Sequence, residues 1–170
     1  MGIYLNPGSE MFEQSLHSEI YVDKTAMIEQ TNRFFKSQQK YLCVSRPRRF
    51  GKTMAADMLC AYYDRTVDGA AIFQGLVIEQ AESFAKYRNT CDVIRLNMQE
   101  FLSETSNMEE LLAFLQEALL WELLQEYPDL AYFRKSSLRH VMETIHRNSR
   151  RFFVIVIDEW DCIFREYPQN

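Results

Sequence analysis

Residues 45–53 read S-R-P-R-R-F-G-K-T and combine the residue types that bind phosphate groups. A glycine at position 51 lets the backbone approach phosphate oxygens without a Cβ in the way. The first N–H groups of a helix that follows would donate hydrogen bonds to those oxygens. Lys52 would then place its ammonium on the terminal phosphates of a nucleotide, and the Thr53 hydroxyl would bind Mg²⁺.

The segment departs from the common phosphate-loop pattern G-x-x-x-x-G-K-[ST], because Arg46 stands where that pattern has its first glycine. A bare Gly-Lys-Thr also fits an ordinary helix start with a lysine near it. The context favours the phosphate-binding interpretation, because an apolar run precedes the segment and a helical pattern follows it.

A second feature is the acidic pair Asp158 and Glu159, which directly follows the apolar run at residues 152–157. In phosphate-loop ATPases the first acid of such a pair holds the magnesium shell and the second polarises the attacking water. Taken alone, the pair is better explained as a strand that exits into a solvated acidic turn. Together with the loop and in this order, it predicts nucleotide binding. The glutamate favours ATP hydrolysis over phosphoryl transfer to a metabolite, because only hydrolysis needs a base for water.

Hydrophobic periodicity supplies the elements that would position these residues. We expect helices over residues 24–36, 52–63, 79–87, 108–126 and 137–147, and strands over residues 41–44, 93–96 and 152–157. Asp23 is the expected cap of the first helix, and the last strand is expected to be buried on both faces. Strands that alternate with helices predict an α/β fold with a parallel sheet.

The composition is that of a globular domain rather than of a disordered or membrane-spanning chain. The 170 residues carry a formal charge of -5, which argues against a general nucleic-acid coat. Residues 1–10 have neither the basic region nor the apolar core of a secretory signal, and no apolar run is long enough for a bilayer. The cysteines show no C-x-x-C spacing, so we expect buried free thiols in a reducing cytoplasm; they are Cys43, Cys60, Cys91 and Cys162.

Three phrases resemble the AAA-ATPase-like family, whose members are largely bacterial and often carry a PD-(D/E)XK nuclease-like domain. They are the Y-V-D-K-T of residues 21–25, the loop of residues 45–53, and the strand that ends at the acidic pair. The form R-P-R-R-F-G-K-[ST] is characteristic of that family, so Arg46 agrees with the family's own pattern. Residues 72–78, I-F-Q-G-L-V-I, are also similar to the family's segment after the loop helix.

The resemblance implies a P-loop fold of the additional-strand type, with ATP as ligand and Mg²⁺ as cofactor. It implies nucleotide contacts for the loop residues Arg46, Pro47, Arg48, Arg49, Phe50, Gly51, Lys52 and Thr53. It also implies that Thr53 and Asp158 bind the metal and that Glu159 is the catalytic base. Residues 21–25 would line the nucleotide's base side, or would form a capped helix start that packs on the sheet.

The family continues beyond Asn170 into further strands, a helical lid and the nuclease-like domain. We therefore expect a lead-in at residues 1–20 and the N-terminal part of an ATPase domain at residues 21–170, with a helical insertion at about 107–148. A later strand would lie between the runs at 41–44 and 152–157. We thus expect this chain alone to have a gap or open strand edges, to hydrolyse ATP poorly and to aggregate.

Two other functions remain open from the sequence. The chain could be a non-catalytic nucleotide-binding or interaction module that acts only with the downstream domains. It could also bind nucleic acid through its arginines, which are Arg46, Arg48, Arg49, Arg147, Arg150 and Arg151. The expected partners are ATP or ADP, the lid and nuclease-like domain and, for the complete protein, nucleic acid or further copies of itself.

Overall fold

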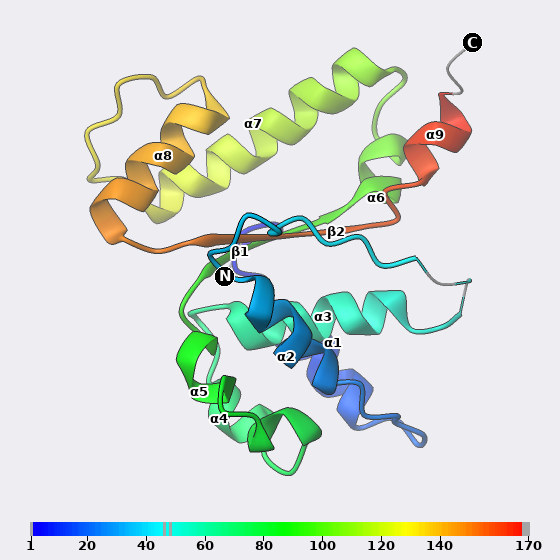
Figure 1. The fold of residues 1–170 in the computed structure, drawn as a ribbon. Helices are drawn as coiled ribbons and strands as arrows, with labels where there is room; N and C mark the ends of the chain where they lie inside the picture. The colour runs from blue at the N-terminus through cyan, green and yellow to red at the C-terminus, as the bar shows by residue number, and fades with distance from the viewer. Residues whose placement is uncertain (1, 46, 48, 168–170) are drawn as a thin grey trace. The chain divides into compact units, whose positions relative to one another are not determined.

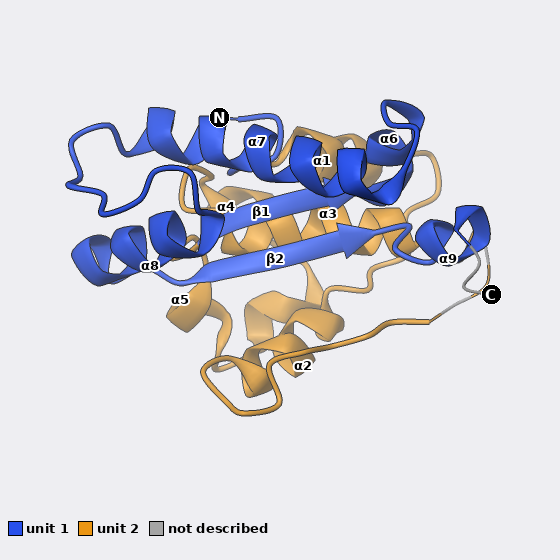
Figure 2. Ribbon diagram, turned by 90° about the horizontal axis from the view of Figure 1, so that it is seen from above, with its two compact units in different colours: residues 1–7, 92–170 blue, residues 8–91 orange. Residues whose placement is uncertain are grey.

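The computed structural model describes residues 2–45, 47 and 49–167, and it has an α/β structure. The chain divides into two compact units, with residues 1–7 and 92–170 in unit 1 and residues 8–91 in unit 2 (Figure 2). The elements shown in Figure 1 are, in order, α1 (Glu10–Leu16), α2 (Ala26–Phe34), α3 (Lys52–Tyr63), α4 (Gly69–Ile72), the 3₁₀ helix η1 (Val77–Gln80), α5 (Phe84–Tyr87), β1 (Asp92–Asn97), α6 (Met98–Ser103), α7 (Met108–Glu126), α8 (Leu138–Ser149), β2 (Phe153–Asp158) and α9 (Cys162–Glu166).

Unit 1 is built on the parallel pair of strands β1 and β2. Asp92 lies opposite Phe153 and Asn97 lies opposite Asp158, so both strands end at the same edge. The connection runs through α6, α7 and α8, and the last two helices cover one face of the strands (Figure 1). The core of this unit is apolar and is formed by Leu5, Ile94, Leu96, Met98, Phe101, Leu102, Leu111, Leu119, Leu123, Val141, Ile145 and Cys162.

The first residues of the chain extend this sheet. Leu5 forms an antiparallel bridge with Ile94, and the Asn6 amide donates to the Val93 carbonyl at 2.7 Å. The Arg95 amide donates to the Tyr4 carbonyl at 2.8 Å. β1 is therefore paired on both sides, which explains why it is the more deeply buried strand.

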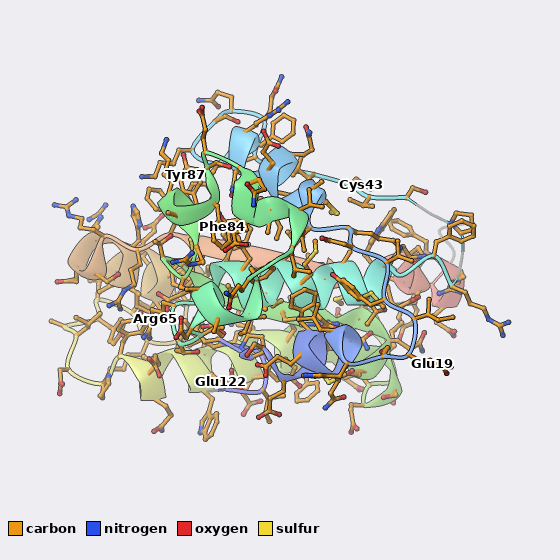
Figure 3. The ribbon with its side chains drawn as sticks, turned by 90° about the horizontal axis from the view of Figure 1, so that it is seen from below. Glu19, Cys43, Arg65, Phe84, Tyr87 and Glu122 are labelled. Atoms are coloured by element: carbon orange, nitrogen blue, oxygen red, sulfur yellow. The ribbon has the colours of Figure 1, made fainter. Side chains whose placement is uncertain are left out.

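One carboxylate on α7 holds this N-terminal segment. Glu122 is only 6% exposed, and its two carboxylate oxygens accept hydrogen bonds from the backbone amides of Ile3, Tyr4 and Leu5 at 2.6 to 3.2 Å. Glu122 is labelled in Figure 3. Because a buried charge is costly unless it is hydrogen-bonded, these amides are what allows a carboxylate at this position.

Unit 2 packs around an aromatic core. Phe73 stacks on Phe12 at a centroid distance of 5.2 Å and meets the edge of Tyr62 at 5.7 Å. Asn32 donates to the Tyr62 hydroxyl at 2.9 Å, and that hydroxyl donates to the Phe84 carbonyl at 2.8 Å. Burial raises the pKa of Tyr62 to about 12, so this hydroxyl stays a donor across the physiological range.

Most expected helices and two of the three expected strands are present. Helices were expected over residues 52–63 and 108–126, and α3 and α7 have these bounds. The strands expected at residues 93–96 and 152–157 are β1 and β2, each displaced by no more than one residue at either end. Across the described residues, every helix falls short of the length and apolarity that crossing a bilayer requires.

The prediction of a strand at residues 41–44 is wrong. These residues have no regular secondary structure, and Tyr41 is 86% exposed. A strand is stable only where its backbone groups pair with a neighbouring strand. β1 and β2 are the only named strands among the described residues, and they pair with each other. Cys43 lies in the same run (Figure 3) and is exposed, which corrects the expectation that every thiol is buried.

Three local expectations also need correction. The helix expected over residues 79–87 is two short helices, η1 and α5, because the backbone of Ala81 between them is extended, with φ -78° and ψ 135°. Thr25, not Asp23, is the N-cap of α2. β2 is not buried on both faces, since Ile155 and Ile157 are about half exposed.

The segment of residues 1–20, expected as a lead-in, contains the helix α1 and the residues that pair with β1.

We predict that Glu122→Gln destabilises unit 1 by about 1–3 kcal/mol, because the amide removes the charge and turns one acceptor into a donor that faces other donors. Chemical denaturation of the variant and the wild type measures this loss. Glu117→Gln, which changes an exposed carboxylate on the same helix, is the matched control. Equal stability of the two variants would contradict the role given to Glu122.

Candidate functional site

The candidate phosphate loop leads into α3 through Gly51. This glycine has φ +75° and ψ +33°, in the left-handed region, and is the N-cap of the twelve-residue helix. Its carbonyl accepts from the Ala55 amide at 3.0 Å, so helical hydrogen bonding starts at this residue. In other residues the Cβ makes this backbone conformation unfavourable, whereas glycine adopts it freely. The local backbone therefore explains why the motif has a glycine at this position.

The remaining loop residues face solvent where the structure describes them. Pro47, Arg49 and Phe50 are exposed, and Arg49 also has a positive φ, of 66°. Lys52 is half-buried and Thr53 is exposed in the first turn of α3. The expected contacts of Arg46 and Arg48 lie outside the described residues.

The Y-V-D-K-T segment contacts the loop through its lysine. Lys24 Nζ donates to the Phe50 carbonyl oxygen at 2.9 Å, directly before Gly51. Its two neighbours bind the segment after α4. Asp23 Oδ2 accepts from the Val77 amide at 2.8 Å, and Thr25 Oγ1 accepts from the Ile78 amide at 3.1 Å. Three phrases that are separate in the sequence are therefore joined by hydrogen bonds within unit 2.

Asp23 is held as an anion by these contacts. Burial would raise the pKa of its carboxyl, but hydrogen bonds from the Thr25 hydroxyl and from the amides of Val77 and Thr25 outweigh burial and lower the pKa. The Thr25 hydroxyl donates to Asp23 Oδ1 at 2.6 Å. The carboxylate is therefore a structural acceptor at the base of the candidate loop.

The acidic pair lies at the end of β2 in unit 1. Asp158 is 6% exposed, and its Oδ1 accepts the Glu159 amide at 3.0 Å. Its Oδ2 lies 3.7 Å from Nη2 of Arg95 on the neighbouring strand. Glu159 has φ +52°, more of its side chain is exposed, and its Oε2 lies 3.7 Å from Arg165. The two acids thus differ in burial and in partner.

Other arginines that could have bound nucleic acid have different surroundings. Arg151 donates to the Tyr127 hydroxyl at 3.2 Å, and that hydroxyl donates to buried Asp92 at 2.6 Å. Arg150 is the left-handed C-cap of α8, and Arg147 lies in its last turn. The chain therefore uses Arg151 inside unit 1 and the other two at a helix end, where cations are stabilised by the helix dipole.

Sequence reasoning missed two basic residues that the structure brings to the candidate groups. Lys24 contacts the loop, whereas the sequence offered its segment as the lining of the nucleotide's base side or as a capped helix start. Arg95 contacts Asp158 across the strand pair. Arg95 was detectable as a charged residue inside the apolar run V-I-R-L, but Lys24 carried no comparable signal, because its partner is 26 residues away.

A family model described as Predicted AAA-ATPase matches residues 8–169, a span that includes both the loop and the acidic pair. The chain belongs to the AAA-ATPase-like family. No curated protein and no solved structure matches it. Membership in the AAA-ATPase-like family agrees with an ATP-binding module and with the mixture of helices and a parallel strand pair in the described residues.

The donor atoms available in the two units are of the class that Mg²⁺ prefers. Thr53 offers a hydroxyl and Asp158 a carboxylate, and magnesium takes oxygen ligands. Among the described residues, no three His, Cys, Asp or Glu side chains come together as a metal cluster. Magnesium sites of nucleotide enzymes use one or two protein oxygens together with phosphate and water oxygens, and each of these two side chains offers an oxygen of that kind.

We predict that Asp23→Asn changes the pH dependence of stability. A carboxyl whose pKa is lowered on folding stabilises the native state above its unfolded pKa of about 4, and this contribution is lost as pH falls through the folded pKa. The stability difference between wild type and Asp23→Asn should therefore shrink as pH falls from about 5 to about 2. Thermal denaturation across this range measures it, with the exposed Glu19→Gln as control. Parallel profiles of wild type and Asp23→Asn would refute the prediction.

Proposed function

We propose that this chain is an ATP-binding module with a P-loop fold of the additional-strand type, and that it supplies the nucleotide site of a Mg²⁺-dependent ATPase. The observation that carries the proposal is the family match over residues 8–169, which contains the loop and the acidic pair in the required order. The start of a long helix directly after Gly51 supports it, because the first N–H groups of a helix and its dipole favour bound anions.

In this proposal the loop residues bind the phosphates. Helix-start amides after Gly51 donate to phosphate oxygens, and the Lys52 ammonium neutralises the terminal phosphates. The arginines of the loop, Arg46, Arg48 and Arg49, add positive charge around the triphosphate, and Pro47 and Phe50 shape the turn. A dense positive charge of this kind explains an arginine-rich loop in a chain whose net charge is -5.

In this proposal the acidic pair, Asp158 and Glu159, binds the metal and activates water. Asp158 and Thr53 would hold Mg²⁺, which when bound neutralises charge on the phosphate oxygens. Glu159 accepts a proton from water as general base. The greater exposure of Glu159 supports its role, because a base for water must be reachable by water. Arg95 Nη2 lies 3.7 Å from Asp158 Oδ2, so Mg²⁺ would have to compete with this guanidinium for the carboxylate.

We predict that Lys52→Ala weakens binding of ATP and ADP roughly tenfold to a hundredfold, because a charge-assisted contact of about 1.5–3 kcal/mol is lost. Titration calorimetry with the folded variant measures it. Lys86→Ala, at an exposed lysine of the same unit, should bind as the wild type does. An unchanged affinity in Lys52→Ala would refute the phosphate-loop assignment.

We further predict that Glu159→Gln and Asp158→Asn differ. The first keeps the shape of the side chain but removes the base, so nucleotide binding should persist while any turnover falls. The second removes a metal ligand, so Mg²⁺-dependent nucleotide binding should itself weaken. Calorimetry with and without Mg²⁺, together with a phosphate-release assay, separates these effects. Two variants with the same binding and turnover would show that the division of roles is wrong.

A further inference from the structure

The contact of Lys24 with Phe50 lies at the peptide that enters the phosphate loop's helix. Lys24 Nζ donates to the Phe50 carbonyl oxygen at 2.9 Å. A trans peptide is planar, so its carbonyl and its N–H point in opposite directions. The N–H in the same peptide belongs to Gly51. By holding the Phe50 carbonyl, Lys24 therefore fixes the direction in which the Gly51 N–H points.

The backbone on both sides of Lys24 is held in place by hydrogen bonds. Asp23 accepts from the Thr25 amide at 2.8 Å and from the Val77 amide at 2.8 Å, and Thr25 is fully buried. The residues on both sides of Lys24 are thus anchored to the segment at Val77 and Ile78. An anchored backbone limits the positions that the lysine ammonium can reach. The ammonium therefore stays within reach of the loop.

Gly51 lies directly against the ammonium of this lysine. A Cβ added to Gly51 would lie 2.9 Å from Lys24 Nζ, so a side chain there would push the lysine away from its place. The positive φ is the constraint that requires a glycine, because the end of a lysine side chain can move. A positive charge is consequently held against the residue whose amide starts the anion-binding turn.

We propose that Lys24 is a positioning residue of the phosphate loop, which orients the Gly51 N–H toward the phosphates and places a second ammonium beside Lys52. This inference rests on the proposed function. A carbonyl turned toward a phosphate would repel it, and the lysine prevents that orientation of the Phe50–Gly51 peptide. The ligand that gains from this arrangement is the polyphosphate chain of the nucleotide, not its base.

The test compares Lys24→Met, Lys24→Arg and the control Lys86→Met, with ATP and inorganic tripolyphosphate as ligands. Lys24→Met should lose about tenfold in affinity for both ligands, because its donor and charge are gone. Lys24→Arg should recover most of the loss, and Lys86→Met should show none. Selective ¹⁵N-glycine labelling gives a second readout, since the chain has five glycines. The shift of the Gly51 amide on adding tripolyphosphate should shrink in Lys24→Met and return in Lys24→Arg.

Several outcomes would overturn the inference. Unchanged affinities in Lys24→Met, or a loss for ATP without a loss for tripolyphosphate, would remove Lys24 from the phosphate side. A lower melting temperature without a selective loss of affinity would reduce it to a structural residue. If Lys24→Met does not fold, Lys24→Gln decides by the same readouts. Failure of wild type to bind ATP, or full binding by Lys52→Ala, would instead defeat the proposed function itself.

Discussion

The candidate loop in unit 2 depends on three consecutive side chains, those of Asp23, Lys24 and Thr25. The outer two bind the amides of Val77 and Ile78, and the middle one binds the carbonyl of Phe50. Hydrogen bonds of this kind contribute modestly to stability one by one. Their value here is geometric, because one short segment sets the positions of two others that lie 26 and 54 residues further along the chain.

The fold was predictable where the signal is local. The leucine-rich periodicity of α7 and the glycine before α3 define these helices within the sequence itself, and the two apolar runs in unit 1 pair as strands. The run at residues 41–44 has the same local signal but no strand partner. Likewise, residues 81–83 contain neither glycine nor proline, yet the backbone of Ala81 is extended and separates η1 from α5. Hydrophobic periodicity does not predict elements whose stability depends on partners distant in sequence.

The candidate site shows the same division between residue types and their environment. The sequence identifies Gly51, Lys52 and Thr53 as chemically suited to phosphate, and Asp158 and Glu159 as a pair at a strand end. It does not reveal that Arg95 lies against Asp158, because that contact depends on the strand register, in which the two residues come from neighbouring strands. Nor does it reveal the lowered pKa of Asp23, which burial opposes and hydrogen bonds from a distant segment produce. Residue spacing predicts which side chains are candidates for the site, whereas their hydrogen-bond and charge partners are known only from the structure.

The pairing of the first residues with β1 and Glu122 makes unit 1 discontinuous in sequence, since residues 8–91 intervene. During synthesis the chain emerges from its N-terminus, and unit 2 is a continuous segment that can collapse as soon as it is out. Residues 2–6 must wait for partners that are made 86 to 119 residues later. Closing so long a loop costs entropy before any contact rewards it, which slows folding. The N-terminal segment of residues 2–6 should therefore be the last part of unit 1 to pair during synthesis, and its backbone should be exposed longest to chaperones.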